Sequence, residues 1–337
     1  MANRWLALVC FTTVGSALLA CNIPVFRYAL ERWNPDACEM ILFHSGPLQT
    51  DEEIQLRKLL PSRIQGLSHS ETVVASQSLG ALSFVDLQTA NDDQKKLWNG
   101  LSKTSSSDLP YLLVSGSVGS TNQFPLWKGP LSELEQASLF RSPARVEMSR
   151  RLLAGDAVVW LLVTGLDQEK NEAIRQRLDL ELPRLAKQIQ LPEGIGLPGS
   201  ELFSEVPLLV QYSYLEIDRN DGKESFLIDL FSSIRPLEVS KGEPLVIPVF
   251  GRGRALEVIP GSELNPQLMT DLTLFLSGAC SCQVKEQNPG FDLLIDCDWK
   301  DELFPEGDEP PPARSIGQGA KRGQSAAPQL LDIPRGR

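Results

Sequence analysis

Histidine is scarce in this chain: only His44 and His69 occur among its 337 residues. Histidine is the most frequent general acid or base in enzymes and a common metal ligand, so few catalytic or metal sites can be built here. His44 ends a short apolar run, where we expect a hydrogen-bonded histidine at the end of a strand. His69 lies in a polar stretch and is expected to be solvated. No catalytic residue is assigned, and the pattern points away from an enzyme.

A Cys-x-x-Cys redox pair is also absent. The six cysteines are Cys10, Cys21, Cys38, Cys280, Cys282 and Cys297. Closely spaced thiolates favour copper(I) or zinc, which makes Cys280, Cys282 and Cys297 candidates for a metal site or for disulfide exchange. Structural disulfides are the favoured prediction in an oxidising compartment, with Cys38, Cys280, Cys282 and Cys297 as the candidates. No cofactor is predicted.

The first twenty residues carry a single charge, Arg4, followed by an apolar run from residue 5 to residue 20. A positive start and a short apolar stretch ending in small residues are typical of an export signal. The run is too short for a comfortable membrane-spanning helix, which needs about 20 apolar residues. We therefore assign residues 1–20 to a signal peptide and expect the protein in the periplasm or cell envelope of a bacterium.

Two cleavage sites are open. Cleavage after Ala17 would release a soluble protein. Residues 18–21, Leu-Leu-Ala-Cys, resemble a bacterial lipobox, in which Cys21 carries a lipid and becomes the N-terminus. The residues that follow Cys21 are typical of an ordered, partly buried segment and not of a flexible tether. This argues against the lipobox. Lipidation would leave four cysteines for two disulfides, which argues for it. Of the two forms we expect the soluble exported one, and a lipid on Cys21, if present, is the one membrane contact predicted.

Basic residues are outnumbered, with 32 Lys and Arg against 43 Asp and Glu and a formal net charge of −11. An acidic body repels phosphate backbones, so nucleic-acid binding is not expected.

Residues 305–337 hold six prolines, five glycines and no aromatic residue. This composition offers too little apolar surface to offset chain entropy and predicts a disordered tail.

Between these ends, strand and helix patterns alternate. In the first half we expect strands at residues 39–44, 81–87, 110–115 and 124–127, and helices at 51–60, 92–101 and 143–154, the last capped by Ser142. In the second half we expect strands at 157–163, 206–217, 245–250 and 254–259 and helices at 168–189 and 263–276, while 224–234 fits a helix or a returning strand. Pro183 should kink or split its helix.

Each half thus reads strand, helix, strand, helix, strand, strand, helix, and Pro110 and Pro244 precede the third strands. This order resembles the thioredoxin-like arrangement, in which that proline is commonly cis. The resemblance implies an α/β fold of two thioredoxin-like domains in tandem, at residues 21–155 and 156–304. Where that family carries its redox pair, this chain has His-Ser-Gly-Pro at 44–47 and Val-Thr-Gly-Leu at 163–166, without a thiol. An ordinary disulfide oxidoreductase is therefore not expected.

A second resemblance is local. It rests on residues 21–33 (CNIPVFRYALERW), 43–44 and 46–47 (FH, GP), 142–145 (SPAR) and 280–285 (CSCQVK). These segments are similar to an uncharacterised family of exported bacterial proteins. The resemblance implies export and supplies no activity.

Two turn motifs remain. Residues 218–222 (DRNDG) have glycine one position too early for a calcium loop, so a hairpin turn is predicted. Residues 251–254 (GRGR) could meet an anion but lack a phosphate-cradling pattern, so a turn between strands is predicted.

We therefore expect an exported, non-catalytic protein that binds a protein or cell-envelope partner through a thioredoxin-like surface. One alternative is an envelope thiol or metal protein that uses Cys280, Cys282 and Cys297. The other is a subunit of a membrane complex that is tethered by lipid on Cys21.

Overall fold

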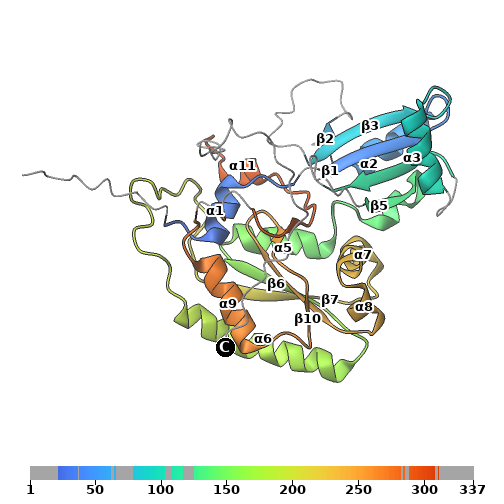
Figure 1. Cartoon of the computed structure of the whole chain (residues 1–337). Coiled ribbons are helices and arrows are strands. Elements are labelled where there is room, and N and C mark those ends of the chain that lie inside the picture. Colours follow the sequence, from blue (N-terminus) through green and yellow to red (C-terminus); the bar gives the residue numbers. More distant parts are fainter. Residues whose placement is uncertain are drawn as a thin grey trace, which may run out of the picture.

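The chain folds into a mixed α/β protein with two mixed β-sheets (Figure 1). The structure is a computed structural model that describes residues 22–36, 38–61, 64–65, 79–102, 108–116, 125–281, 284, 288–307 and 310. The predicted signal peptide, most of the predicted tail, His69, Cys21 and Cys282 lie outside these residues.

The first sheet has the strand order β2-β3-β1-β4-β5. Its strands are β1 (Cys38–His44), β2 (Ile64–Gln65), β3 (Gly80–Asp86), β4 (Tyr111–Ser115) and β5 (Pro125–Pro130). β1 runs parallel to β3 and antiparallel to β4, and β4 pairs antiparallel with β5. The crossovers carry α2 (Thr50–Leu59) and α3 (Asp92–Ser102). Each element predicted for this part is present, and the Leu109-Pro110 peptide bond is cis.

The second sheet has the order β11-β9-β8-β6-β7, with β10 also paired to β8. Its strands are β6 (Val158–Val163), β7 (Tyr212–Ile217), β8 (Leu245–Phe250), β9 (Arg254–Ala255), β10 (Ile259–Pro260) and β11 (Phe291–Asp292). β6 runs parallel to β7 and antiparallel to β8. Every residue of β6 is buried, as its uninterrupted apolar sequence predicts for a strand covered on both faces.

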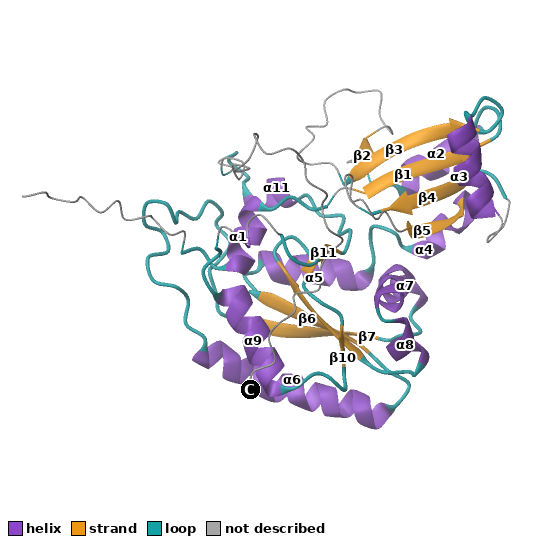
Figure 2. Ribbon diagram, in the orientation of Figure 1, coloured by secondary structure: helices purple, strands orange, loops and turns teal. Residues whose placement is uncertain are grey.

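Helices cover both faces of the second sheet (Figure 2). α1 (Val25–Arg32), α6 (Gln168–Gln188) and α9 (Pro266–Ser277) share an apolar cluster with Val158, Trp160 and Leu162 of β6. α5 (Pro143–Leu153) and α7 (Ser225–Ile234) pack with the alternate residues of β6 on the other face. The short helices are η2 (Leu131–Glu133), α4 (Leu134–Ala137), η3 (Gly222–Glu224), α8 (Pro236–Ser240) and α11 (Trp299–Leu303).

The two sheets share a core. One apolar cluster joins Met40 and Leu42 of β1 to Val159 and Leu161 of β6. α1 comes before β1 in the chain, yet it packs on α9 and β8 of the second sheet. α5 follows β5 and also packs on β6 and β7. The predicted boundary at residue 155 assigns both helices to the first domain, whereas their apolar contacts are with the second sheet.

Four predictions for the second half need correction. α6 continues through Pro183 without a split. β7 begins at Tyr212 rather than at residue 206, and the predicted strand 254–259 is interrupted to form β9 and β10. Residues 218–222 do not form a hairpin, because β7 is parallel to β6 and the chain must cross over before β8, which it does through α7. Among the described helices, none has the length and apolar character needed to cross a membrane.

Candidate functional site

The carboxyl ends of β1 and β3 meet at one edge of the first sheet. Their last residues, His44 and Asp86, are register partners. β4 runs the opposite way and places Tyr111 beside Phe43, so Pro110 enters β4 at this same edge. Ligands of open α/β sheets bind at the carboxyl ends of parallel strands. We call His44, Ser45, Gly46, Phe84, Asp86 and Gln88 the first-sheet edge.

The Asp86 carboxylate holds the two loops of this edge together. Its Oδ1 accepts the backbone N–H of Gly46 at 3.1 Å and that of Gln88 at 3.0 Å. These two hydrogen bonds, with a smaller contribution from the His44 ring, lower the pKa of Asp86. Gly46 has φ +75°, a left-handed conformation that glycine adopts without a steric cost. The loop after β1 is therefore fixed in a single tight turn.

His44 is oriented by the same turn. Its Nδ1 lies 2.7 Å from the carbonyl oxygen of Gly46. Because a carbonyl oxygen only accepts hydrogen bonds, Nδ1 is the nitrogen that donates in this contact. The ring stands edge-to-face with Phe84, with centroids 6.3 Å apart, and Phe84 is 46% exposed. The edge thus combines an accessible aromatic ring with a half-exposed imidazole.

Serine, histidine and aspartate all occur at this edge, but they do not have the spatial arrangement of a catalytic triad. A triad needs a histidine that lies between the nucleophile and the acid. Here Nδ1 of His44 is bound to Gly46, and Oδ1 of Asp86 is bound to backbone N–H groups. The Ser45 hydroxyl accepts a bond from the Gln88 side chain at 3.4 Å. These three side chains therefore do not form a Ser-His-Asp relay.

The corresponding edge of the second sheet is closed. The Asn171 side chain is fully buried and bonds both the N–H and the carbonyl of Gly165. Leu166 donates its backbone N–H to the Gly242 carbonyl at 2.8 Å. A Cβ on Gly165 would lie only 2.5 Å from that same carbonyl oxygen. The loop is thus packed against the segment before β8.

The cysteines predicted as a group are separated. Cys280 packs in the cluster beneath α1 and α9, whereas Cys38 and Cys297 belong to the cluster on the opposite face of the sheet. No disulfide joins these three residues to one another, so the pairings predicted among them are absent. Burial raises the pKa of the Cys38 thiol to about 12. Within the described part of the chain, no group of three or more potential ligands gathers for a metal ion.

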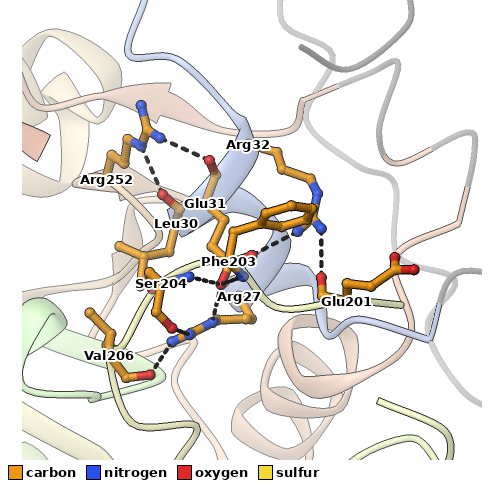
Figure 3. A network of polar contacts seen from close by, with 9 residues as sticks. All are labelled: Arg27, Leu30, Glu31, Arg32, Glu201, Phe203, Ser204, Val206 and Arg252. Carbon is orange, nitrogen blue, oxygen red and sulfur yellow. Dashed lines mark hydrogen bonds and ion pairs between the residues drawn. The ribbon is translucent and has the colours of Figure 1, made fainter. Parts of the chain in front are cut away.

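A buried polar network ties α1 to the segment after α6 (Figure 3). Arg27 pairs with Glu31 at 2.9 Å and donates to the carbonyls of Ser204 and Val206. Glu31 accepts the backbone N–H groups of Phe203 and Ser204, both at 3.2 Å. Sequence reasoning missed this network. The i,i+4 spacing of Arg27 and Glu31 was its one visible signal.

The glycine–arginine turn at residues 251–254 completes the anchoring of α1. Arg252 donates to the carbonyls of Leu30 and Glu31 at 2.7 and 2.9 Å. Arg254 bonds the Asp36 carboxylate and three carbonyls at residues 288–290. Both guanidinium groups donate their hydrogen bonds to oxygen atoms of the protein. The turn therefore holds α1 in place and is not used to bind an anion.

Two small cavities lie beside this turn. They are lined in part by Arg27 and by Arg252, and each has a volume of about 10 Å³, room for about one water.

No protein-family model, curated protein or solved structure matches the chain. The candidate site therefore rests on its own geometry.

Proposed function

We propose that this chain is an exported, non-catalytic protein of the bacterial envelope that binds a protein or envelope partner at the first-sheet edge. The observation that carries the proposal is the pairing of the exposed Phe84 ring of β3 with His44 at the end of β1, beside a turn that the Asp86 carboxylate fixes through Gly46. A rigid aromatic group binds a partner at little cost in conformational entropy. The resemblance to an exported family, carried largely by residues 21–33, supports the location.

We further propose that both sheets belong to thioredoxin-like units. The support is their common strand order, β3-β1-β4-β5 and β7-β6-β8-β9, in which the first two strands are parallel and the next two antiparallel. The missing redox pair then leaves the edge as a binding surface. The separation of Cys38, Cys280 and Cys297 favours this role over a thiol or metal protein.

A photo-crosslinking experiment in the producing bacterium tests the proposal. The crosslinking residue p-benzoylphenylalanine would replace Phe84 or, as the control, Leu180, which is 69% exposed on α6. We expect a partner adduct at position 84 that is missing at position 180. The same partner should be captured by the purified Leu180→Glu variant and lost by Phe84→Glu.

Equal capture by the two charge variants would contradict the proposal. So would turnover of a disulfide or ester substrate that Phe84→Glu or His44→Ala abolishes while the fold is retained.

A further inference from the structure

Two carboxyl groups and one guanidinium group meet beside the connection from α1 to β1. Asp292 of β11 and Arg254 of β9 are register partners on neighbouring antiparallel strands, so their side chains lie on the same face of the sheet. Asp36 lies in the connection. Its carboxylate is 2.9 Å from Nη1 of Arg254, and its backbone N–H donates to Oδ2 of Asp292 at 3.4 Å. The α1–β1 connection is therefore bonded to both strands.

Asp292 also holds the chain that follows it. Its Oδ1 accepts the backbone N–H of Leu294 at 2.8 Å. Leu294 has φ +52°, a left-handed conformation that is unfavourable for a residue with a Cβ, and it is buried in the apolar cluster that joins the two sheets. One carboxyl group thus links the α1–β1 connection to the turn at Leu294, with one oxygen atom for each.

Arg254 compensates one of the two carboxylates directly. Its Nη1 donates to Asp36, while its Nε and Nη2 donate to carbonyl oxygens of residues 288–290. Among the described contacts, no hydrogen bond joins this guanidinium group to the carboxyl group of Asp292. Ionisation of both carboxyl groups therefore leaves one negative charge that Arg254 does not neutralise.

The second carboxyl group is buried as well. Asp292 is 9% exposed, and among the described residues the other titratable groups beside it are the Cys38 thiol and the Arg252 guanidinium. Burial raises the pKa of the thiol to about 12, so it is uncharged, and Arg252 donates to carbonyl oxygens at the end of α1. Burial, and next the Asp36 carboxylate, raise the pKa of Asp292 to about 7, although Arg254 opposes the shift.

We propose that Asp36 and Asp292 form a pH-sensitive switch, which fixes the α1–β1 connection to β11 while one of the two carboxyl groups is protonated and releases it when both are ionised. Two carboxylates in one buried place repel each other, so a proton on one of them stabilises the closed arrangement. On ionisation the proton passes to solvent, which reaches the Asp36 side chain at 31% exposure. Release lets water solvate both charges. This inference goes beyond the proposed function and does not rest on it.

The release should be local and should follow the pH. α1 stays in place because the Arg27–Glu31 pair and Arg252 hold it without Asp292. The closed form keeps its proton up to about pH 7, whereas a released aspartate loses it at about pH 3.9. The connection is therefore held most firmly below about pH 4, less firmly as the pH rises to about 7, and without further weakening above that value.

Hydrogen exchange of the full chain at pH 5 and pH 8 tests the switch. It is read by mass spectrometry and corrected for the chemical exchange rate at each pH. Peptides that contain Asp36 or Leu294 should be at least about tenfold less protected at pH 8, because each pH unit up to 7 favours the released form by up to about tenfold. They should also be at least about tenfold less protected than peptides of β6 at pH 8, since release does not require unfolding of the whole chain.

Three variants identify the groups. Asp292→Asn cannot ionise, so the pH-dependent loss of protection should vanish. Asp36→Asn leaves Arg254 facing a single carboxyl group, so the loss should become smaller. Asp301→Asn, the matched control, removes an exposed carboxylate of α11 and should behave as the unmodified chain does.

Equal protection at the two pH values in the unmodified chain would overturn the inference, and that comparison requires no variant to fold. So would a loss in Asp292→Asn as large as in the unmodified chain, or peptides of the connection that are as well protected as those of β6 at pH 8. Partner capture at Phe84 is measured separately, and its failure would leave these results unchanged.

Discussion

Arg27 and Glu31 form an ion pair across one turn of α1 in which both side chains are at most 1% exposed. Glu31 also accepts backbone N–H groups of Phe203 and Ser204, and Arg27 donates to the carbonyls of Ser204 and Val206. The pair therefore replaces most of the solvation that both charges lose on burial. It also fixes the N-terminal helix, and with it Asn22, on the second sheet.

Removal of one partner should be costly, because the other charge stays buried without its counter-charge. We expect Glu31→Gln to lower the free energy of unfolding by about 3 kcal/mol, measured by urea denaturation. The control is Glu135→Gln, which breaks an ion pair with Lys58 whose side chains are 65% and 68% exposed. That change should be below about 1 kcal/mol. Equal effects of the two substitutions would contradict a stabilising role of the buried pair.

Asp292 should make stability depend on pH near neutrality. Burial, and next the nearby Asp36 carboxylate, raise the pKa of Asp292 to about 7, although Arg254 opposes the shift. The unfolded value is about 3.9. Between about pH 4 and 7 the folded protein thus holds a proton that the unfolded chain has released, so its stability falls as pH rises through this window and levels off above it.

The free energy of unfolding should fall by at most about 1.4 kcal/mol per pH unit in this window because of Asp292. Asp292→Asn should remove this contribution. Urea denaturation at several pH values measures it. Asp93→Asn on α3, where the carboxylate is exposed, is the control and should keep the slope. If the free energy of unfolding of Asp292→Asn depended on pH as steeply as that of the unmodified protein, the pH dependence would come from other carboxylates.

Gly165 closes the edge of the second sheet through its lack of a side chain. A Cβ there would lie 2.5 Å from the Gly242 carbonyl oxygen and 2.7 Å from Cδ of Pro244. Gly165→Ala should therefore destabilise the protein by about 1–3 kcal/mol, as overpacking does, in thermal or urea unfolding. Gly100→Ala in α3, where nothing lies within 4 Å, should instead stabilise it by about 0.5–1 kcal/mol. The same sign for both substitutions would refute the packing argument.

Local patterns predicted the elements well where local chemistry decides the structure. The uninterrupted apolar run of β6 marks a strand buried on both faces, and Ser142 followed by Pro143 marks the start of α5. Pro183 does not split α6, which accommodates it at an exposed position within a helix that the apolar stripe of Ile174 and Leu178 holds on the sheet. Tertiary packing outweighs the loss of one helical hydrogen bond there.

The candidate site and the anchoring of α1 were beyond local patterns. Asp86 bonds Gly46 from 40 residues away, and Glu31 bonds Ser204 from 173 residues away. The charged Arg27 and Glu31 are typical of an exposed helix, yet each is buried because distant backbone groups solvate it. Such partners depend on the fold, so a single sequence contains no signal for them.

Cys38 offers a direct check on the non-catalytic proposal. It begins β1, is 1% exposed, and burial raises its pKa to about 12. The thiolate is the reactive form of cysteine, so Cys38 in the folded protein should resist iodoacetamide at pH 8 and react once urea unfolds the chain. Peptide mass mapping of the two samples measures this difference. Rapid alkylation of Cys38 in the folded protein would mean an accessible, activated thiol at the start of the first sheet. It would then favour the thiol function over partner binding.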